Sequence, residues 1–227
     1  IRSRGKPRGN FLANIVQLEE GGPRRASLEP LMRLVGDDLS KVNRTILDRM
    51  DSRALLIPQL AGHIIASGGK RLRPMLTLAS ALLCGYVGER QIGLAAAVEF
   101  IHTASLLHDD VVDESDLRRG DTTANVLWGN QPSVLVGDFL FSRAFQIMVA
   151  DGSLEVLRVL ADASAIISEG EVMQLETLNN VDIPEEKYLD VVAAKTAALF
   201  SAASRIGALI AGKGRVEEDA LESYGRN

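Results

Sequence analysis

Apolar side chains recur every three or four residues along most of the chain after residue 28. The clearest run is Leu31, Leu34, Val35, Leu39, Val42, Ile46 and Leu47. Spacing near 3.6 residues places such side chains on one face of an α-helix. We find no convincing strand pattern and no exact repeat, so the sequence predicts an all-α fold.

Proline, glycine and capping residues divide this pattern into helices. Pro58 interrupts the first helical region, and a short second helix runs to about Ser67. Further helices are expected from about Arg73 to Tyr86, Glu89 to Asp113, Pro132 to Ala150, Ser153 to Thr177, Pro184 to Gly212, and from Val216 onward. Short connections imply antiparallel neighbours in a helical bundle.

Composition narrows the class of protein. The 227 residues are 46% hydrophobic but only 4% aromatic, which favours closely packed helices over a β-sandwich. A formal net charge of −5 argues against general nucleic-acid binding. The single cysteine, Cys84, excludes an intramolecular disulfide, fits a reducing compartment and is expected to be a small buried residue.

The apolar stretches and the ends of the chain help to predict the cellular location of the protein. No uninterrupted apolar stretch reaches the ~18 residues of a spanning helix, since Arg205 cuts the best candidate. We therefore predict no transmembrane segment, no signal peptide and a cytoplasmic protein. Residues 1–27, rich in Arg, Gly and Pro, are expected to form a flexible basic arm, and residues 28–227 the folded domain. The first residue, Ile1, and the polar end at Asn227 predict a fragment.

An acidic cluster lies at the end of the helix expected at residues 89–113. Asp109 and Asp113 are four residues apart and share one helical face. At ~4 Å, two carboxylates repel by about 4 kcal/mol at an effective dielectric near 20, and Mg²⁺ relieves such repulsion. Asp110, about 100° away around the helix, is a third candidate for the metal site or a support behind it. Such clusters are usually solvated, but the apolar run before this one favours a functional site.

A basic turn marks the start of an earlier helix: Gly68-Gly69-Lys70-Arg71-Leu72-Arg73-Pro74. Its three cations add to the partial positive charge of a helix N-terminus, which favours a bound anion such as a diphosphate. A basic surface turn is the alternative interpretation. A second basic pair, Arg118-Arg119, follows the acidic cluster.

Three further positions are ambiguous from sequence. His102 lies seven residues before Asp109 on nearly the same stripe, as a core residue or a phosphate donor. Lys195-Thr196 lies inside an apolar helix, where the lysine either extends to solvent or meets a ligand. Gln174 is either a core amide or a substrate contact.

Together, in this order and spacing, these motifs resemble the trans-isoprenyl diphosphate synthases over residues 30–227. The resemblance implies an all-α bundle around a central cavity, a homodimer, and Mg²⁺-dependent condensation of isopentenyl diphosphate with an allylic diphosphate. Residues implied to bind isopentenyl diphosphate are Lys70, Arg73, His102 and Arg119. Asp109 and Asp113 would bind Mg²⁺ on the allylic diphosphate, with further contacts from Arg118, Lys195, Thr196 and Gln174.

The resemblance also bears on product length. Ala104 and Ser105 lie five and four residues before Asp109, about 6–7.5 Å along the helix. Short-chain members carry a bulky aromatic near here, whereas two small side chains would let the product grow past Ile101 and Val98. A long all-trans product of about C40–C50 follows, of the kind used as a quinone tail, with peripheral membrane contact on its release.

One part of the family pattern is absent from the 227 residues, namely the second aspartate-rich motif on a later helix. On this ground we expect the chain to lack its C-terminal part and to be inactive or nearly so by itself. Three alternatives remain open: a non-catalytic regulatory homologue, a terpene cyclase, and a purely structural bundle. A cyclase has no use for the basic turn, and a structural bundle predicts no Mg²⁺-dependent diphosphate binding.

Overall fold

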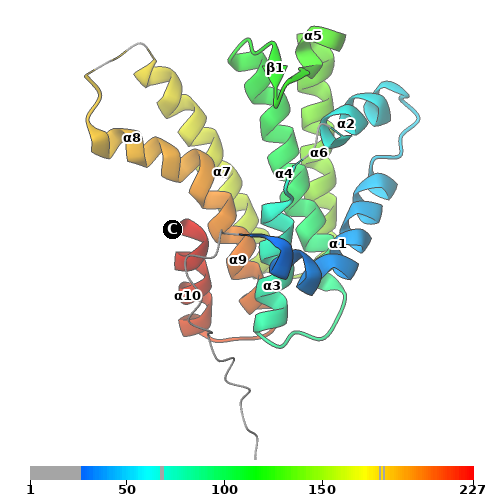
Figure 1. The fold of residues 1–227 in the computed structure, drawn as a ribbon, viewed down its shortest axis with the longest axis vertical. Helices are drawn as coiled ribbons and strands as arrows, with labels where there is room; N and C mark the ends of the chain where they lie inside the picture. Colours follow the sequence, from blue (N-terminus) through cyan, green and yellow to red (C-terminus); the bar gives the residue numbers. More distant parts are fainter. Residues whose placement is uncertain (1–26, 67–68, 179, 181) are drawn as a thin grey trace, which may run out of the picture.

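A computed structural model describes residues 27–66, 69–178, 180 and 182–227. The expected basic arm lies almost entirely outside these residues, and so does Gly68. The described part is a helical bundle, as predicted (Figure 1). Its helices are α1 Glu29–Arg49, α2 Leu56–Ala66, α3 Leu72–Leu83, α4 Arg90–Val112, α5 Ala124–Trp128, α6 Asn130–Asp151, α7 Leu154–Thr177, α8 Glu185–Val192, α9 Ala198–Ile210 and α10 Arg215–Arg226.

Several predicted boundaries are confirmed, and the N-cap of α7 explains one of them. The Ser153 hydroxyl accepts a hydrogen bond from the Val156 amide at 3.3 Å, which satisfies a free donor at the helix start. Several predictions were wrong in detail. Pro58 does not interrupt the first helix, because α1 already ends at Arg49 and Pro58 lies in the first turn of α2, where proline is tolerated. The helix expected from Pro184 to Gly212 contains a π-helical turn, η1 Ala193–Ala197, and a short hairpin pairs β1 Leu117–Arg118 with β2 Asp121–Thr122.

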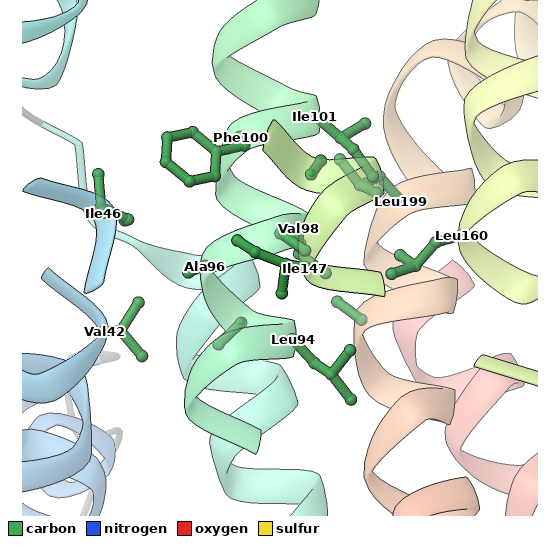
Figure 2. Packing of buried hydrophobic residues seen from close by; sticks show 14 of the residues in the cluster. Val42, Ile46, Leu94, Ala96, Val98, Phe100, Ile101, Ile147, Leu160 and Leu199 are labelled. Atoms are coloured by element: carbon green, nitrogen blue, oxygen red, sulfur yellow. The ribbon is translucent and has the colours of Figure 1, made fainter. Parts of the chain in front are cut away.

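Helix α4 forms the centre of the core because it buries side chains on several of its faces. Figure 2 shows Val42 and Ile46 of α1 on one side of it, and Leu160 of α7 and Leu199 of α9 on the other. Phe100 of α4 is 1% exposed. Full burial of a side chain of this size stabilises the fold by about 1.5–3 kcal/mol. The residues of α4 that carry chemistry are therefore held on a well-packed helix.

Helix α6 is long and apolar enough to cross a membrane by length and composition, the one such helix in the described ranges. The sequence prediction missed this because it required an uninterrupted apolar run, and α6 contains Asp138 and Arg143. Core helices often satisfy the same criterion, and α6 packs along α4 with Leu140 and Ala144 fully buried.

The expected burial of Cys84 also needs correction, because this residue is only partly buried at the end of α3.

Candidate active site

The acidic end of α4 holds a carboxylate in a partly buried, crowded position. Burial, together with the nearby Glu171 and Asp113 carboxylates and against the opposing effect of Lys195, raises the pKa of Asp109 from its ordinary value of 3.8 to about 7. Excess negative charge of this kind favours a bound cation. Asp113, the C-cap of α4, supplies the second carboxylate one turn away. These two donors fit a hard cation such as Mg²⁺, although no complete three-residue metal cluster occurs among the described residues.

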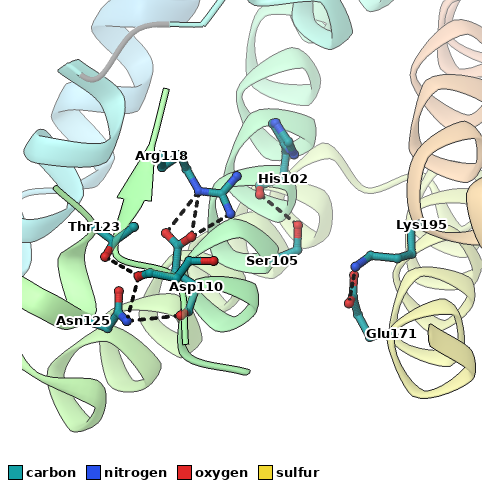
Figure 3. A network of polar contacts seen from close by, with 9 residues as sticks. His102, Ser105, Asp110, Arg118, Thr123, Asn125, Glu171 and Lys195 are labelled. Carbon is teal, nitrogen blue, oxygen red and sulfur yellow. Dashed lines mark hydrogen bonds and ion pairs between the residues drawn. The ribbon is translucent and has the colours of Figure 1, made fainter. Parts of the chain in front are cut away.

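Asp110 has a different partner from the other two acids. Its carboxylate is 1% exposed and pairs with Arg118, whose Nη2 lies 2.7 Å from Oδ1 and whose Nε lies 2.9 Å from the same oxygen. The Asn125 amide of α5 donates to the Asp110 carbonyl at 3.1 Å, which ties α5 to the end of α4 (Figure 3). This geometry favours the supporting role for Asp110 over direct metal binding. It also engages Arg118, which the sequence placed on the substrate.

A lysine faces the acidic helix end from the opposite side of the site. Lys195 of η1 lies 2.6 Å from a Glu171 carboxylate oxygen (Figure 3). It also donates to Gln174 Oε1 at 2.7 Å. Thr196, on the same turn, is exposed. The sequence prediction missed Glu171 as a site residue. Its position three residues before Gln174, on the same helical face, was the available signal.

The π-helical turn that carries Lys195 packs closely on α7 at Gly170. A Cβ at Gly170 would lie 2.7 Å from the Ala194 Cβ and 3.0 Å from the Lys195 backbone nitrogen. Single π-helical turns inside helices are frequent at functional sites. The absence of a side chain at Gly170 therefore lets α7 and η1 approach closely enough for Glu171 and Gln174 to hold Lys195.

Replacement of Gly170 by alanine tests this packing. We expect Gly170→Ala to destabilise the protein by about 1–3 kcal/mol because the backbones must separate. Chemical denaturation measures the change. Gly36→Ala on α1 is the matched control, because a Cβ there meets nothing within 4 Å. It should stabilise by about 0.5–1 kcal/mol through helix propensity. Equal effects of the two substitutions would contradict the packing argument.

The basic turn, α4 and α9 enclose a second part of the site, a cavity of about 460 Å³. It is lined by Gly69, Lys70, Arg71, Leu72, Arg73, Glu99, His102, Arg119 and Phe200. The four residues that the resemblance assigned to isopentenyl diphosphate therefore meet in one place. Gly69 lies so near Arg119 that a Cβ there would be 3.0 Å from the arginine Nη1.

Charges in this cavity are arranged to receive an anion. The Arg73 guanidinium stacks on the Phe200 ring at 4.2 Å, and its buried Nε has no hydrogen-bond partner in the described part of the chain. Burial lowers the Arg73 pKa to about 10, so the side chain stays charged near pH 7. Burial and four nearby arginines lower the His102 pKa to about 3. His102 is therefore neutral and can still donate one hydrogen bond.

The residues predicted to set product length lie lower on α4. Val98, Ile101 and Ala104 are at most 2% exposed, whereas Ser105 is half-buried and donates to the His102 carbonyl at 2.9 Å. A larger cavity, about 520 Å³, lies between α7, α9 and α10. None of the predicted site residues lines it, so the chemistry is concentrated around α4.

Comparison with known proteins gives consistent matches. The polyprenyl synthetase family model matches residues 55–227. The chain is 50% identical over 200 residues to an octaprenyl diphosphate synthase of Escherichia coli, covering 88% of this chain and 62% of that protein. It is 47% identical over 200 residues to the octaprenyl diphosphate synthase of Haemophilus influenzae, covering 88% and 61%.

Solved structures agree with these sequence matches. A decaprenyl diphosphate synthase from Rhodobacter capsulatus is 52% identical with a TM-score of 0.86, covering 88% of this chain and 62% of that one. A polyprenyl synthase from Caulobacter crescentus, complexed with calcium and isoprenyl diphosphate, is 52% identical with a TM-score of 0.88, covering 90% and 62%. The chain thus spans about 62% of the length of these relatives.

Proposed function

We propose that this chain, which belongs to the polyprenyl synthetase family, carries the substrate sites of a long-chain polyprenyl diphosphate synthase. The reaction joins isopentenyl diphosphate to an allylic diphosphate, giving an all-trans product of about C40–C50 for a quinone side chain. One observation carries the proposal: a cationic cavity and an acidic helix end share α4, with His102 and Asp109 seven residues apart. That spacing is about 10 Å along the helix, which suits two diphosphates held side by side.

Different residues bind each of the two substrates. Lys70, Arg73 and Arg119 hold isopentenyl diphosphate through charge-assisted hydrogen bonds, and neutral His102 adds a donor. Asp109 and Asp113 would hold Mg²⁺, which would supply electrostatic stabilisation of the departing diphosphate. Lys195 approaches the same diphosphate from η1. As the allylic C–O bond breaks, the isopentenyl double bond attacks the allylic carbon, and a proton then leaves to the diphosphate.

The active protein is proposed to be a cytoplasmic homodimer. An apolar face on α5 and α6 supports this, since Val126, Leu127, Leu135, Phe145 and Val149 are 38–66% exposed. Exposed apolar patches of this kind mark interaction surfaces. We expect Leu135→Glu to convert a dimer to a monomer in sedimentation measurements, with Glu155→Gln as a surface control. A dimer that resists the substitution would contradict this assignment of the interface.

Product analysis by mass spectrometry tests the function directly. A catalytically active form of the protein, given farnesyl and isopentenyl diphosphates with Mg²⁺, should yield a long polyprenyl diphosphate. A terpene cyclase would leave isopentenyl diphosphate unused, and a regulatory homologue would make no product without a partner.

The 227 residues alone contain one aspartate-rich motif. We therefore expect them to bind both substrates in calorimetry but to turn over little, whereas a structural bundle would bind neither.

A further inference from the structure

Glu99 is the one carboxylate among the residues that line the cationic cavity. It lies on α4, three residues before His102, and its side chain is only 7% exposed. A buried carboxylate in a site for a diphosphate repels the ligand, so direct binding does not explain its presence. Burial of such a charge is tolerated where the charge is paired and hydrogen-bonded.

Its partner is Arg71, which the proposed substrate contacts do not use. Arg71 Nη1 forms an ion pair with Glu99 Oε1, and Nη2 donates to the Ile65 carbonyl at 3.3 Å. The Arg71 side chain is 16% exposed. The two terminal nitrogens of the guanidinium, Nη1 and Nη2, thus both contact protein atoms, while the Arg71 residue lines the cavity.

The backbone of Arg71 is in an unfavourable conformation. Its φ of 49° and ψ of 36° are left-handed, a region that side chains with a Cβ seldom occupy. This residue is also the N-cap of α3, and its carbonyl accepts from the Met75 amide at 3.0 Å. The left-handed turn therefore fixes how Lys70, before it, and Arg73, in the first helical turn, are directed.

We propose that Glu99 is a positioning residue for the isopentenyl diphosphate site. Through Arg71 it holds the left-handed turn, so that Lys70 and Arg73 are already placed before the ligand arrives. The inference rests on the proposed function, because it assigns the cavity to that substrate. It predicts that loss of Glu99 weakens anion binding, although removal of a negative charge from a cationic cavity would by electrostatics alone strengthen it.

The test compares three variants of the 227-residue chain by calorimetry with isopentenyl diphosphate and with inorganic pyrophosphate. We expect Glu99→Ala to weaken binding about tenfold. This fold-change corresponds to the free-energy cost of holding one residue in the left-handed conformation without its ion pair. Glu99→Ala with Arg71→Gly should recover most of this loss, because glycine adopts positive φ without an anchor. Glu99→Ala with Arg71→Ala should not recover it. Tighter binding by Glu99→Ala, or equal behaviour of the Gly and Ala double variants, would overturn the proposal.

Two further measurements separate this inference from the proposed function. Mg²⁺-dependent binding of farnesyl diphosphate, at the Asp109 end of α4, should be unchanged in Glu99→Ala. Amide hydrogen exchange at Lys70 and Arg71 in the ligand-free protein should become faster in Glu99→Ala and slow again with Arg71→Gly. If the wild-type chain bound no diphosphate, the proposed function would fail. Exchange would still decide the positioning role, since unchanged rates would exclude it.

Discussion

Asp109→Asn should strongly weaken Mg²⁺-dependent binding of an allylic diphosphate and, at the same time, stabilise the metal-free protein at pH 8. The first effect follows because Asp109 is one of the two carboxylates at the end of α4 that are proposed to bind Mg²⁺. Loss of one charged partner in a desolvated contact costs about 2–5 kcal/mol, or roughly 30- to 5000-fold in affinity. Calorimetry with farnesyl diphosphate, with and without Mg²⁺, measures this effect.

The stability effect follows from the direction of the Asp109 pKa shift. The folded pKa of about 7 lies above the ordinary value of 3.8, so the folded protein holds this proton more tightly than the unfolded chain. The resulting stability is present below pH 4, is lost as pH rises from about 4 to 7, and changes little above that. Because the Asp109 side chain is partly exposed, we expect a difference of about 1–2 kcal/mol after solvent screening. Asparagine removes this dependence on pH.

Asp110→Asn is the matched control, because it neutralises the adjacent acid in a different environment. The Asp110 carboxylate is fully buried against Arg118, so loss of its charge leaves a partly buried guanidinium without its charged partner. Breaking such a pair costs about 3–5 kcal/mol. Thermal unfolding at pH 8 without metal should therefore give opposite shifts for the two variants. Destabilisation by Asp109→Asn would show that its charge is compensated in the folded protein.

The contrast between Asp109 and Asp110 also marks what a sequence can predict. Helical periodicity placed Asp109, Asp113 and His102 on one stripe of α4, because that relation depends only on spacing within one helix. The pairing of Asp110 with Arg118 depends on the hairpin between β1 and β2. Each strand has only two residues, too few for an alternating pattern to be recognised, and the turn requires positive φ at Arg119 and Gly120.

Contacts between segments far apart in the sequence could not be predicted from the sequence either. Arg71 and Glu99 are 28 residues apart, and Lys195 is 21 residues from Gln174. From the sequence, each of these residues considered by itself is consistent with an ordinary surface charge or a core amide. The resemblance to a known family predicted Lys70, Arg73, Lys195 and Gln174 as substrate contacts, but it did not predict Glu99 or Glu171, which pair with Arg71 and Lys195. These supporting residues emerge only when packing brings α4, α7 and η1 together.

The second large effect that we predict is a change in product length. Ser105→Phe should shorten the product by several isoprene units. Ser105 is half-buried on the stripe that carries His102 and Asp109, about 6 Å along α4 from Asp109. In the proposed arrangement, a phenyl ring there would stand below the allylic diphosphate, in the path of the growing chain. Mass spectrometry of products from an active form of the protein measures the shift, and Ser105→Ala, which keeps the position small, should leave the length unchanged.

Ala104→Phe should also shorten the product, but with a structural cost that Ser105→Phe avoids. Ala104 is 1% exposed and lies one turn before His108, whose ring contacts the Val134 carbonyl of α6 at 3.1 Å. A phenyl group at Ala104 must therefore enter the region between α4 and α6, which overpacks the core by about 1–3 kcal/mol. If both phenylalanine variants stayed active and made full-length product, the growing chain could not pass along this part of α4. The small side chains at these positions would then serve helix packing alone.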